Sequence, residues 1–120
     1  MLVNLSNHPL NSWSNTQTDA ALAEFGEIID FPFPNVEPNW DEEKIATLAD
    51  QISADIIEHH EREISAVHVM GEFTLTHALI QRFKKKGYTC VASTSKRIVE
   101  DLPDGSKKVK FEFCRFRRYE

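Results

Sequence analysis

Apolar and polar positions along the chain follow two different periods. Short runs of apolar and β-branched residues predict strands at the start of the stretch 1–9 and over 27–31, 66–70 and 88–92. Between these runs, apolar residues recur every three or four positions, as they do on one face of an amphipathic helix. This spacing predicts helices over 15–25, over 40–62, and from residue 74 to the lysines that precede Gly87.

Residues at the ends of these segments support the three helices. Ser14, followed three residues later by Gln17, forms a capping box, and Asn39 is suited to be the N-cap of the second helix. The third helix ends in Lys84-Lys85-Lys86-Gly87, with cations in its last turn and glycine just beyond it.

Residues 97–102 and 108–116 alternate in a period of two around the turn 103–106, which predicts a C-terminal antiparallel β-hairpin. The whole order, β-α-β-α-β-α-β followed by this hairpin, predicts an α/β fold. We expect a Rossmann-like three-layer sandwich with a mainly parallel sheet, formed by residues 1–120 as one domain.

The net charge of −5 is unevenly distributed along the chain. Residues 1–80 hold two bases and 14 acids, a net charge of −12, whereas residues 81–120 hold 12 bases and five acids, a net charge of +7. A basic face of this kind can steer an anionic ligand. The same numbers also fit an acidic, solvated helix surface beside a lysine-rich helix end.

Composition excludes several classes of protein. No apolar run approaches the about 18 residues of a membrane span, and the apolar start lacks the basic region of a secretory signal. We therefore expect a cytoplasmic protein with no membrane partner. Cys90 and Cys114 are too few for a disulfide framework, so both are interpreted as reduced core residues.

Polar residues follow three of the predicted parallel strands, and the carboxyl ends of such strands meet at one rim of the sheet, where ligands bind. Hydroxyls, amides at helix starts and cations are the groups that hold a phosphodiester. The glycine among them allows a ligand to approach the backbone closely. The candidates are Ser6, Asn7 and His8; Gly71, Glu72 and Thr74; and Ser93, Thr94, Ser95, Lys96 and Arg97.

Each candidate also has a structural interpretation that the sequence leaves open. Ser6 and Asn7 can end a strand by bonding to the backbone, and Ser93 to Ser95 can be turn residues. Glu72 can stabilise a helix N-terminus. His68, inside an apolar strand, is interpreted as a hydrogen-bonded core histidine, and His59 and His60 as solvated.

No nucleotide-binding glycine motif, zinc-protease motif or nucleophile-elbow motif is present, so no cofactor is expected. His8 and Glu72 fall short of the three ligands that a catalytic metal usually needs, so no metal is expected. The ending 114–119 interleaves aromatics with arginines, as a single-strand nucleic-acid surface does. We favour an ordinary charged edge strand as the explanation, and we expect no long nucleic acid as partner.

Three segments resemble the small ring nucleases of type III CRISPR systems and the related CARF sensor domains. These are Leu5-Ser6-Asn7-His8-Pro9, Val69-Met70-Gly71-Glu72 and Ala92-Ser93-Thr94-Ser95-Lys96-Arg97. Some small members place Ser directly before His-Pro, whereas Asn7 intervenes here. The resemblance implies a homodimer that binds a cyclic oligoadenylate second messenger, with cyclic tetra-adenylate as the expected ring.

The resemblance further implies cleavage without a metal, in which a ribose 2′-hydroxyl attacks the adjacent phosphorus and leaves a 2′,3′-cyclic phosphate. On this hypothesis Lys96 or Arg97 stabilises the developing charge and His8 is the general base or acid. Glu72 would bind a ribose hydroxyl or orient His8, and the remaining rim residues would bind the ligand.

Three alternatives stay open. The same pocket can bind the cyclic nucleotide without cutting it, as a sensor or a sequestering module. The chain can be a structural subunit that binds no nucleotide. It can also be a nucleoside or sugar transferase with Glu72 as the carboxylate nucleophile.

Overall fold

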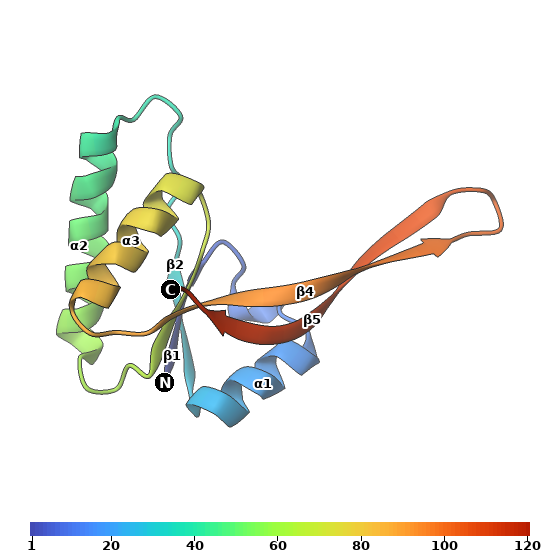
Figure 1. Ribbon diagram of the computed structural model, residues 1–120, viewed down its shortest axis with the longest axis horizontal. Coiled ribbons are helices and arrows are strands. Elements are labelled where there is room, and N and C mark those ends of the chain that lie inside the picture. The colour runs from blue at the N-terminus through green and yellow to red at the C-terminus, as the bar shows by residue number, and fades with distance from the viewer.

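The computed structural model describes residues 1–120 and has the predicted α/β architecture (Figure 1). Five strands and three α-helices alternate along the chain until the last two strands, which form the antiparallel hairpin. The elements in order are β1 (Leu2–Ser6), the short 3-10 helix η1 (Leu10–Ser12), α1 (Asn15–Phe25), β2 (Ile28–Pro32), α2 (Glu42–His60), β3 (Ala66–Met70), α3 (Phe73–Lys85), β4 (Cys90–Asp101) and β5 (Lys107–Arg118).

The sheet has the strand order β2-β1-β3-β4-β5. β1 pairs in parallel with both β2 and β3, and β3 pairs in parallel with β4, whereas β4 and β5 are antiparallel. The chain leaves β1 toward one edge of the sheet and then crosses back to β3 on the other side. The strand order therefore reverses between β1 and β3, and in doubly wound sheets the ligand crevice lies at the carboxyl ends of such strands.

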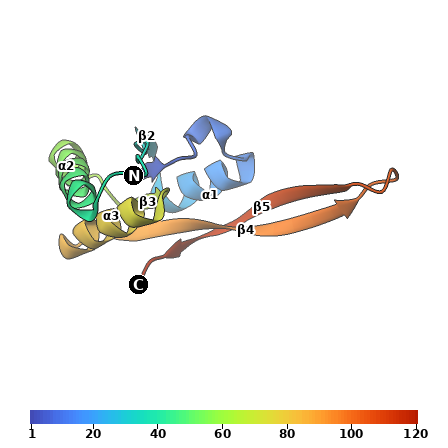
Figure 2. The ribbon, with the colours of Figure 1, turned by 90° about the horizontal axis from the view of Figure 1, so that it is seen from above.

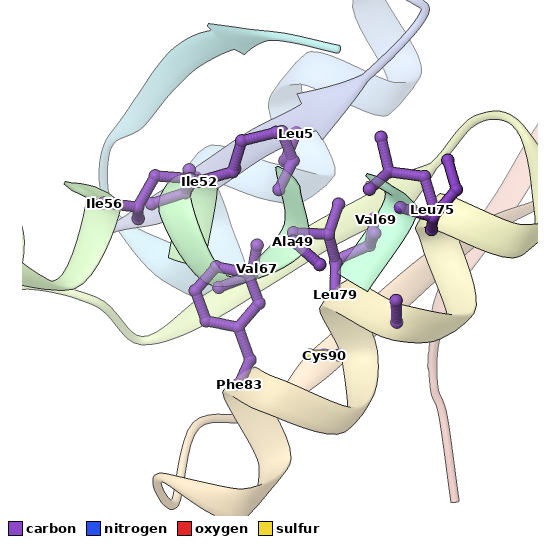
Figure 3. Packing of buried hydrophobic residues seen from close by; sticks show 13 residues of the cluster. Leu5, Ala49, Ile52, Ile56, Val67, Val69, Leu75, Leu79, Phe83 and Cys90 are labelled. Atoms are coloured by element: carbon purple, nitrogen blue, oxygen red, sulfur yellow. The ribbon is translucent and has the colours of Figure 1, made fainter. Parts of the chain in front are cut away.

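Helices cover both faces of the sheet, which makes the three layers. α2 and α3 cover one face, where Leu5, Val67 and Val69 pack against Ile52 and Phe83 (Figure 3). The opposite face packs a smaller cluster around α1, formed by Leu2, Trp13, Ala21, Ala66, Val91 and Phe116. Because β1 and β3 are buried on both faces, their alternate positions belong to two separate cores.

The hairpin extends well beyond the rest of the molecule (Figures 1 and 2). The prediction of two separate strands over 88–92 and 97–102 is wrong, because both lie in the continuous strand β4. Ser93 to Lys96, which we expected between the two strands, are strand residues as well. The reason is that β5 pairs with β4 from Val91 to Asp101, so the hydrogen-bonded ladder passes without a break through these polar residues apart from one irregularity between Thr94 and Ser95.

Two local predictions also need correction. The N-cap of α2 is Asp41, whose side chain accepts a hydrogen bond from the Lys44 N–H, and not Asn39. Cys90 is buried as expected, and burial raises the pKa of its thiol to about 12, but Cys114 is exposed on β5. Ser14 does cap α1, accepting from the Gln17 N–H at 3.2 Å.

None of the helices is both long and apolar enough to cross a membrane.

Candidate functional site

Two adjoining cavities lie at the carboxyl ends of β1 and β3, where the strand order reverses. The larger has a volume of about 490 Å³ and the smaller about 260 Å³. Both are lined by His8 and Met70, so we treat them together as one groove. The larger is also lined by Ser12, Trp13, Ser14, Gln17, His68, Ser93, Thr94, Ser95, Phe111 and Phe113, and the smaller by Asn7, Gly71, Phe73, Thr76 and Tyr119.

The groove brings together six of the eleven residues that the sequence singled out. His8, Ser93, Thr94 and Ser95 line the larger cavity, and Asn7, Gly71 and again His8 line the smaller one. The other five do not line it: Ser6, Glu72, Thr74, Lys96 and Arg97. Ser93, Thr94 and Ser95 line the larger cavity beside His8 as residues of strand β4, and not as residues of a loop.

The His8 backbone is held firmly although its side chain is exposed. Its carbonyl oxygen accepts from the Asn4 side-chain amide at 2.9 Å and from the Trp13 indole N–H at 3.0 Å. The Asn7 N–H donates to the Met70 carbonyl oxygen at 3.1 Å, which ties the loop to β3. The backbone of His8 is therefore fixed at a position where the residue lines both cavities.

A buried polar network lies beneath the groove, on the face of the sheet that α1 covers. The Asn4 amide donates to the Asp30 carboxylate at 2.9 Å, and the Ser6 hydroxyl donates to the Asn4 Oδ1 atom at 2.7 Å. The same Oδ1 atom lies 2.8 Å from Nδ1 of His68. Ser6 is thus part of the network inside the protein and is 5% exposed.

His68 is 1% exposed and bridges the network to β4. Its Nε2 atom lies 3.2 Å from the Ser93 Oγ atom. Trp13 and Phe116 pack edge-on against the ring, with centroid distances of 5.3 and 5.7 Å. Burial, followed by the nearby His8, lowers the pKa of His68 to about 4, so the imidazole is neutral at pH 7. The interpretation of His68 as a hydrogen-bonded core residue is confirmed, but its ring also reaches the groove.

Glu72 acts as the N-cap of α3. Its carboxylate accepts from the Leu75 N–H at 2.8 Å, from the Thr74 N–H at 3.0 Å and from the Thr74 hydroxyl. These bonds, with the Leu75 N–H first, lower the pKa of the Glu72 carboxyl. The Thr74 and Leu75 N–H groups at the start of α3 therefore already donate to the Glu72 carboxylate, and so does the Thr74 hydroxyl.

The space beside Gly71 is filled by protein. A Cβ atom at this position would lie 2.5 Å from the Phe33 ring. Glycine is required here because Phe33 packs against the backbone, a reason that the sequence did not provide.

Lys96 and Arg97 lie beyond the β-bulge that separates Thr94 from Ser95. Arg97 lies opposite Phe111 and shares a face with Ser95, whereas Lys96 lies opposite Glu112 on the other face. Only Arg97 therefore belongs to the face of β4 that lines the groove.

Sequence reasoning missed the network that joins Asn4, Asp30 and His68, of which Asn4 and His68 are buried and Asp30 is exposed. Asn4, Asp30 and His68 occupy the same register position in three neighbouring strands. Each of these three strands has one polar residue at the same position along its length. Aligning the three predicted strands with one another could have revealed this pattern. Phe73, 90% exposed at the start of α3, was also missed.

The smaller cavity contains a further unexplained group. The Thr76 Oγ1 atom is buried and has no hydrogen-bond partner. Buried hydroxyls are nearly always paired, so this orphaned atom is an exception in a residue that lines the smaller cavity.

No three His, Cys, Asp or Glu side chains lie close enough together to hold a metal ion. The pair His8 and Glu72 also fails as a partial metal site, because the Glu72 carboxylate caps α3.

Comparison with known proteins identifies a family but no characterised relative. No curated protein and no solved structure matches the chain. A family model, described as the uncharacterized protein MJ1673 family, matches residues 1–117, which is nearly the whole chain. The chain therefore belongs to the uncharacterized protein MJ1673 family.

Proposed function

We propose that the protein is a ring nuclease that binds a cyclic oligoadenylate, with cyclic tetra-adenylate as the expected ring, and cleaves it by attack of a ribose 2′-hydroxyl. The observation that carries this proposal is the position of His8, which lines both cavities of the groove. A ring ligand that fills both cavities places a phosphodiester beside this imidazole. Cleavage would end type III CRISPR signalling.

The larger cavity has the donors that phosphates and riboses need. Hydroxyls of Ser12, Ser14, Ser93 and Ser95 line it, and the Arg97 guanidinium follows on the same face of β4. Hydroxyls and a guanidinium donate to phosphate oxygens and stabilise the charge that develops on phosphorus during attack. Lys96 lies on the other face of β4, so Arg97 is the better candidate for this role.

The smaller cavity suits an adenine base better than a phosphate. Glu72 places a negative charge at the start of α3, which disfavours an anion there. Phe73 offers an exposed aromatic face, and base stacking on such a face contributes about 1–3 kcal/mol.

The reaction requires the attacking 2′-oxygen, the phosphorus and the leaving 5′-oxygen to lie in line, and it requires two proton transfers. The ribose 2′-hydroxyl loses its proton and attacks the adjacent phosphorus, and the 5′ oxygen leaves with a proton. His8 supplies the acid or the base, because an imidazole can both donate and accept a proton in general acid–base catalysis. The products are linear oligoadenylates that end in a 2′,3′-cyclic phosphate.

A homodimer is part of this proposal. One face of the hairpin extension exposes Phe111, Val99 and Val109, which the strand register places side by side. Two-stranded ribbons are marginally stable alone in water, so a second copy covering this face would stabilise it. Since Phe111 also lines the larger cavity, the same contact would complete the wall of the groove.

The test is incubation of the protein with cyclic tetra-adenylate in the presence of a chelator, with products resolved by chromatography and mass spectrometry. We expect His8→Ala to lose about 100-fold in cleavage rate while the dissociation constant changes by less than about threefold. His59→Ala, which removes an exposed histidine on α2, is the matched control and keeps the full rate.

The alternative is a sensor that binds the ring without cutting it. Tight binding of intact cyclic tetra-adenylate by the wild-type protein, with no product after prolonged incubation, would favour the sensor and exclude the nuclease. Absence of binding to any cyclic oligoadenylate in calorimetry would exclude both.

A further inference from the structure

Three side chains from three strands form a continuous hydrogen-bonded chain that ends at the groove. Asn4 of β1 contacts Nδ1 of His68 in β3 at 2.8 Å, and Nε2 of the same ring contacts the Ser93 hydroxyl of β4 at 3.2 Å. Asn4 and His68 are each 1% exposed, whereas Ser93 is half-buried and lines the larger cavity. The chain therefore runs from the core to the surface of the groove.

The bonds of Asn4 determine which ring nitrogen of His68 carries the proton. Both donor positions of the Asn4 amide are used, by the His8 carbonyl oxygen and the Asp30 carboxylate, each at 2.9 Å. Oδ1 of Asn4 is therefore the atom that faces His68, and it can only accept. Nδ1 of the neutral imidazole must then be the donor, which leaves the lone pair of Nε2 directed at Ser93.

The Ser93 hydroxyl has one proton and two neighbouring acceptors. The Met70 Sδ atom lies 3.1 Å from Oγ, and Nε2 of His68 lies 3.2 Å from it. The thioether is the weaker acceptor and already faces the Ser93 N–H at 3.3 Å. The hydroxyl proton is therefore best placed on the imidazole side.

We propose that Ser93, His68 and Asn4 form a proton relay that activates the Ser93 hydroxyl at the groove, with Ser93 as the catalytic residue, His68 as its proton acceptor and Asn4 as the positioning residue. A serine whose proton is taken by a histidine that a third side chain orients is the arrangement of serine nucleophiles on many unrelated folds.

The natural reaction of the relay rests on the proposed function. The 2′-hydroxyl of the bound ring gives its proton to the Ser93 Oγ atom as Ser93 gives its own proton to Nε2 of His68. The bond from 2′-oxygen to phosphorus forms, the bond from phosphorus to the 5′-oxygen breaks, and the 5′-oxygen takes a proton from His8. The proton on His68 then returns to Ser93 as the Ser93 hydroxyl gives a proton to solvent in the groove, and solvent restores the proton of His8.

A fluorophosphonate probe tests the activation of Ser93 without any cyclic nucleotide. The Ser93 Oγ atom attacks the probe phosphorus, the phosphorus–fluorine bond breaks, fluoride leaves, and the hydroxyl proton passes to His68. We expect mass spectrometry of peptides to locate the label on Ser93 in the wild-type protein. Ser93→Ala abolishes labelling, and Ser106→Ala, which removes an exposed hydroxyl in the turn between β4 and β5 outside the groove, is the matched control and keeps the full labelling rate.

The supporting residues are tested by the labelling rate together with the melting temperature. His68→Gln and Asn4→Ser are expected to lower the labelling rate by about 100-fold and about tenfold in samples that still melt cooperatively. If either variant does not fold, the location of the label and the comparison of Ser93→Ala with Ser106→Ala still decide the proposal.

The results separate this proposal from the proposed function. Label on Ser93 without cleavage of cyclic tetra-adenylate supports the relay and overturns the ring nuclease. Cleavage with no label on Ser93, or with full activity in Ser93→Ala, overturns the relay and leaves the ring nuclease intact.

Discussion

Asn4 and His68 are paired in register on neighbouring strands, and the Oδ1 atom of one lies 2.8 Å from the Nδ1 atom of the other inside the sheet. Buried polar groups are stable only when they are paired, so each of these side chains depends on the other. The pair explains why two otherwise apolar strands each tolerate a polar residue at the same depth.

The stability of the fold should depend on pH through His68. Its pKa is lowered to about 4 by burial and by His8, below the ordinary value of 6.5, so the unfolded chain binds the proton more tightly than the folded protein. The contribution of neutral His68 to the free energy of unfolding is therefore complete above pH 6.5 and is lost as the pH falls toward 4. The free energy of unfolding should fall by about 2 kcal/mol between pH 7.5 and pH 5, as measured by urea denaturation.

His59 provides a contrast within the same experiment. Hydrogen bonding and charge from Asp55 raise the pKa of this exposed histidine, so its effect on stability has the opposite sign. A His68→Gln variant should lose the pH dependence assigned to His68. An unchanged dependence in that variant would show that other groups cause it.

Removal of the Asn4 side chain should disturb several partners at once. Asn4→Ala leaves the Asp30 carboxylate, the Ser6 hydroxyl and His68 without their shared partner. Since each buried polar group left unpaired costs about 1–3 kcal/mol, we expect a loss of about 3 kcal/mol or more in urea denaturation. Asn7→Ala, at an exposed position three residues later, should change stability by less than about 0.5 kcal/mol.

Much of the fold follows from local patterns in the sequence. The bounds of α1 and β3 agree with the prediction, because Ser14 and Gly26 mark the ends of α1 and an unbroken apolar run marks β3. The extent of β4 could not be predicted, because polar residues such as Ser93 and Thr94 resemble a loop unless their pairing with β5 is known.

The sequence predicted groove residues of the candidate site but not the buried hydrogen bonds that join them. His8 and Ser93 were found because polar residues after apolar runs indicate a rim. The link between them through Asn4 and His68 depends on which strands are neighbours, and that is a long-range property. Gly71 was found for the wrong reason, since the ring of Phe33 that requires glycine comes from a distant loop.

The close contact between Gly71 and Phe33 gives a direct test of this packing. In Gly71→Ala the added Cβ atom would lie 2.5 Å from the Phe33 ring, so the ring or the backbone must move. Overpacking of this kind costs about 1–3 kcal/mol, measured as a shift in the urea midpoint. In a Phe33→Ala background the same substitution should cost much less, because the ring is gone, and an equal cost in both backgrounds would disprove the steric cause.

Glu72 distinguishes the proposed function from a transferase that uses this carboxylate as nucleophile. Because the Glu72 carboxylate caps α3, Glu72→Ala should cost about 1 kcal/mol of stability, as the loss of an N-cap does. Under the ring-nuclease proposal, cleavage of cyclic tetra-adenylate by Glu72→Gln stays within about threefold of wild type. A loss of about 100-fold or more in that variant would favour the transferase chemistry.

The hairpin extension gives a test of the proposed homodimer. Phe111 is 65% exposed, Val99 42% and Val109 44%, and their register places them on one face of the ribbon. Burial of these side chains against a second copy would stabilise the dimer, so Phe111→Ser combined with Val109→Thr should weaken dimerisation by about tenfold or more. Analytical ultracentrifugation over a range of concentrations measures this change. Lys110→Ser, on the opposite face of β5, is the matched control and should leave the dimer unchanged. At about 100 μM protein, an association free energy of about −6 kcal/mol would produce a visible dimer. If the wild-type protein sediments as a monomer at this concentration, the result contradicts the dimer and the completion of the groove by a second copy.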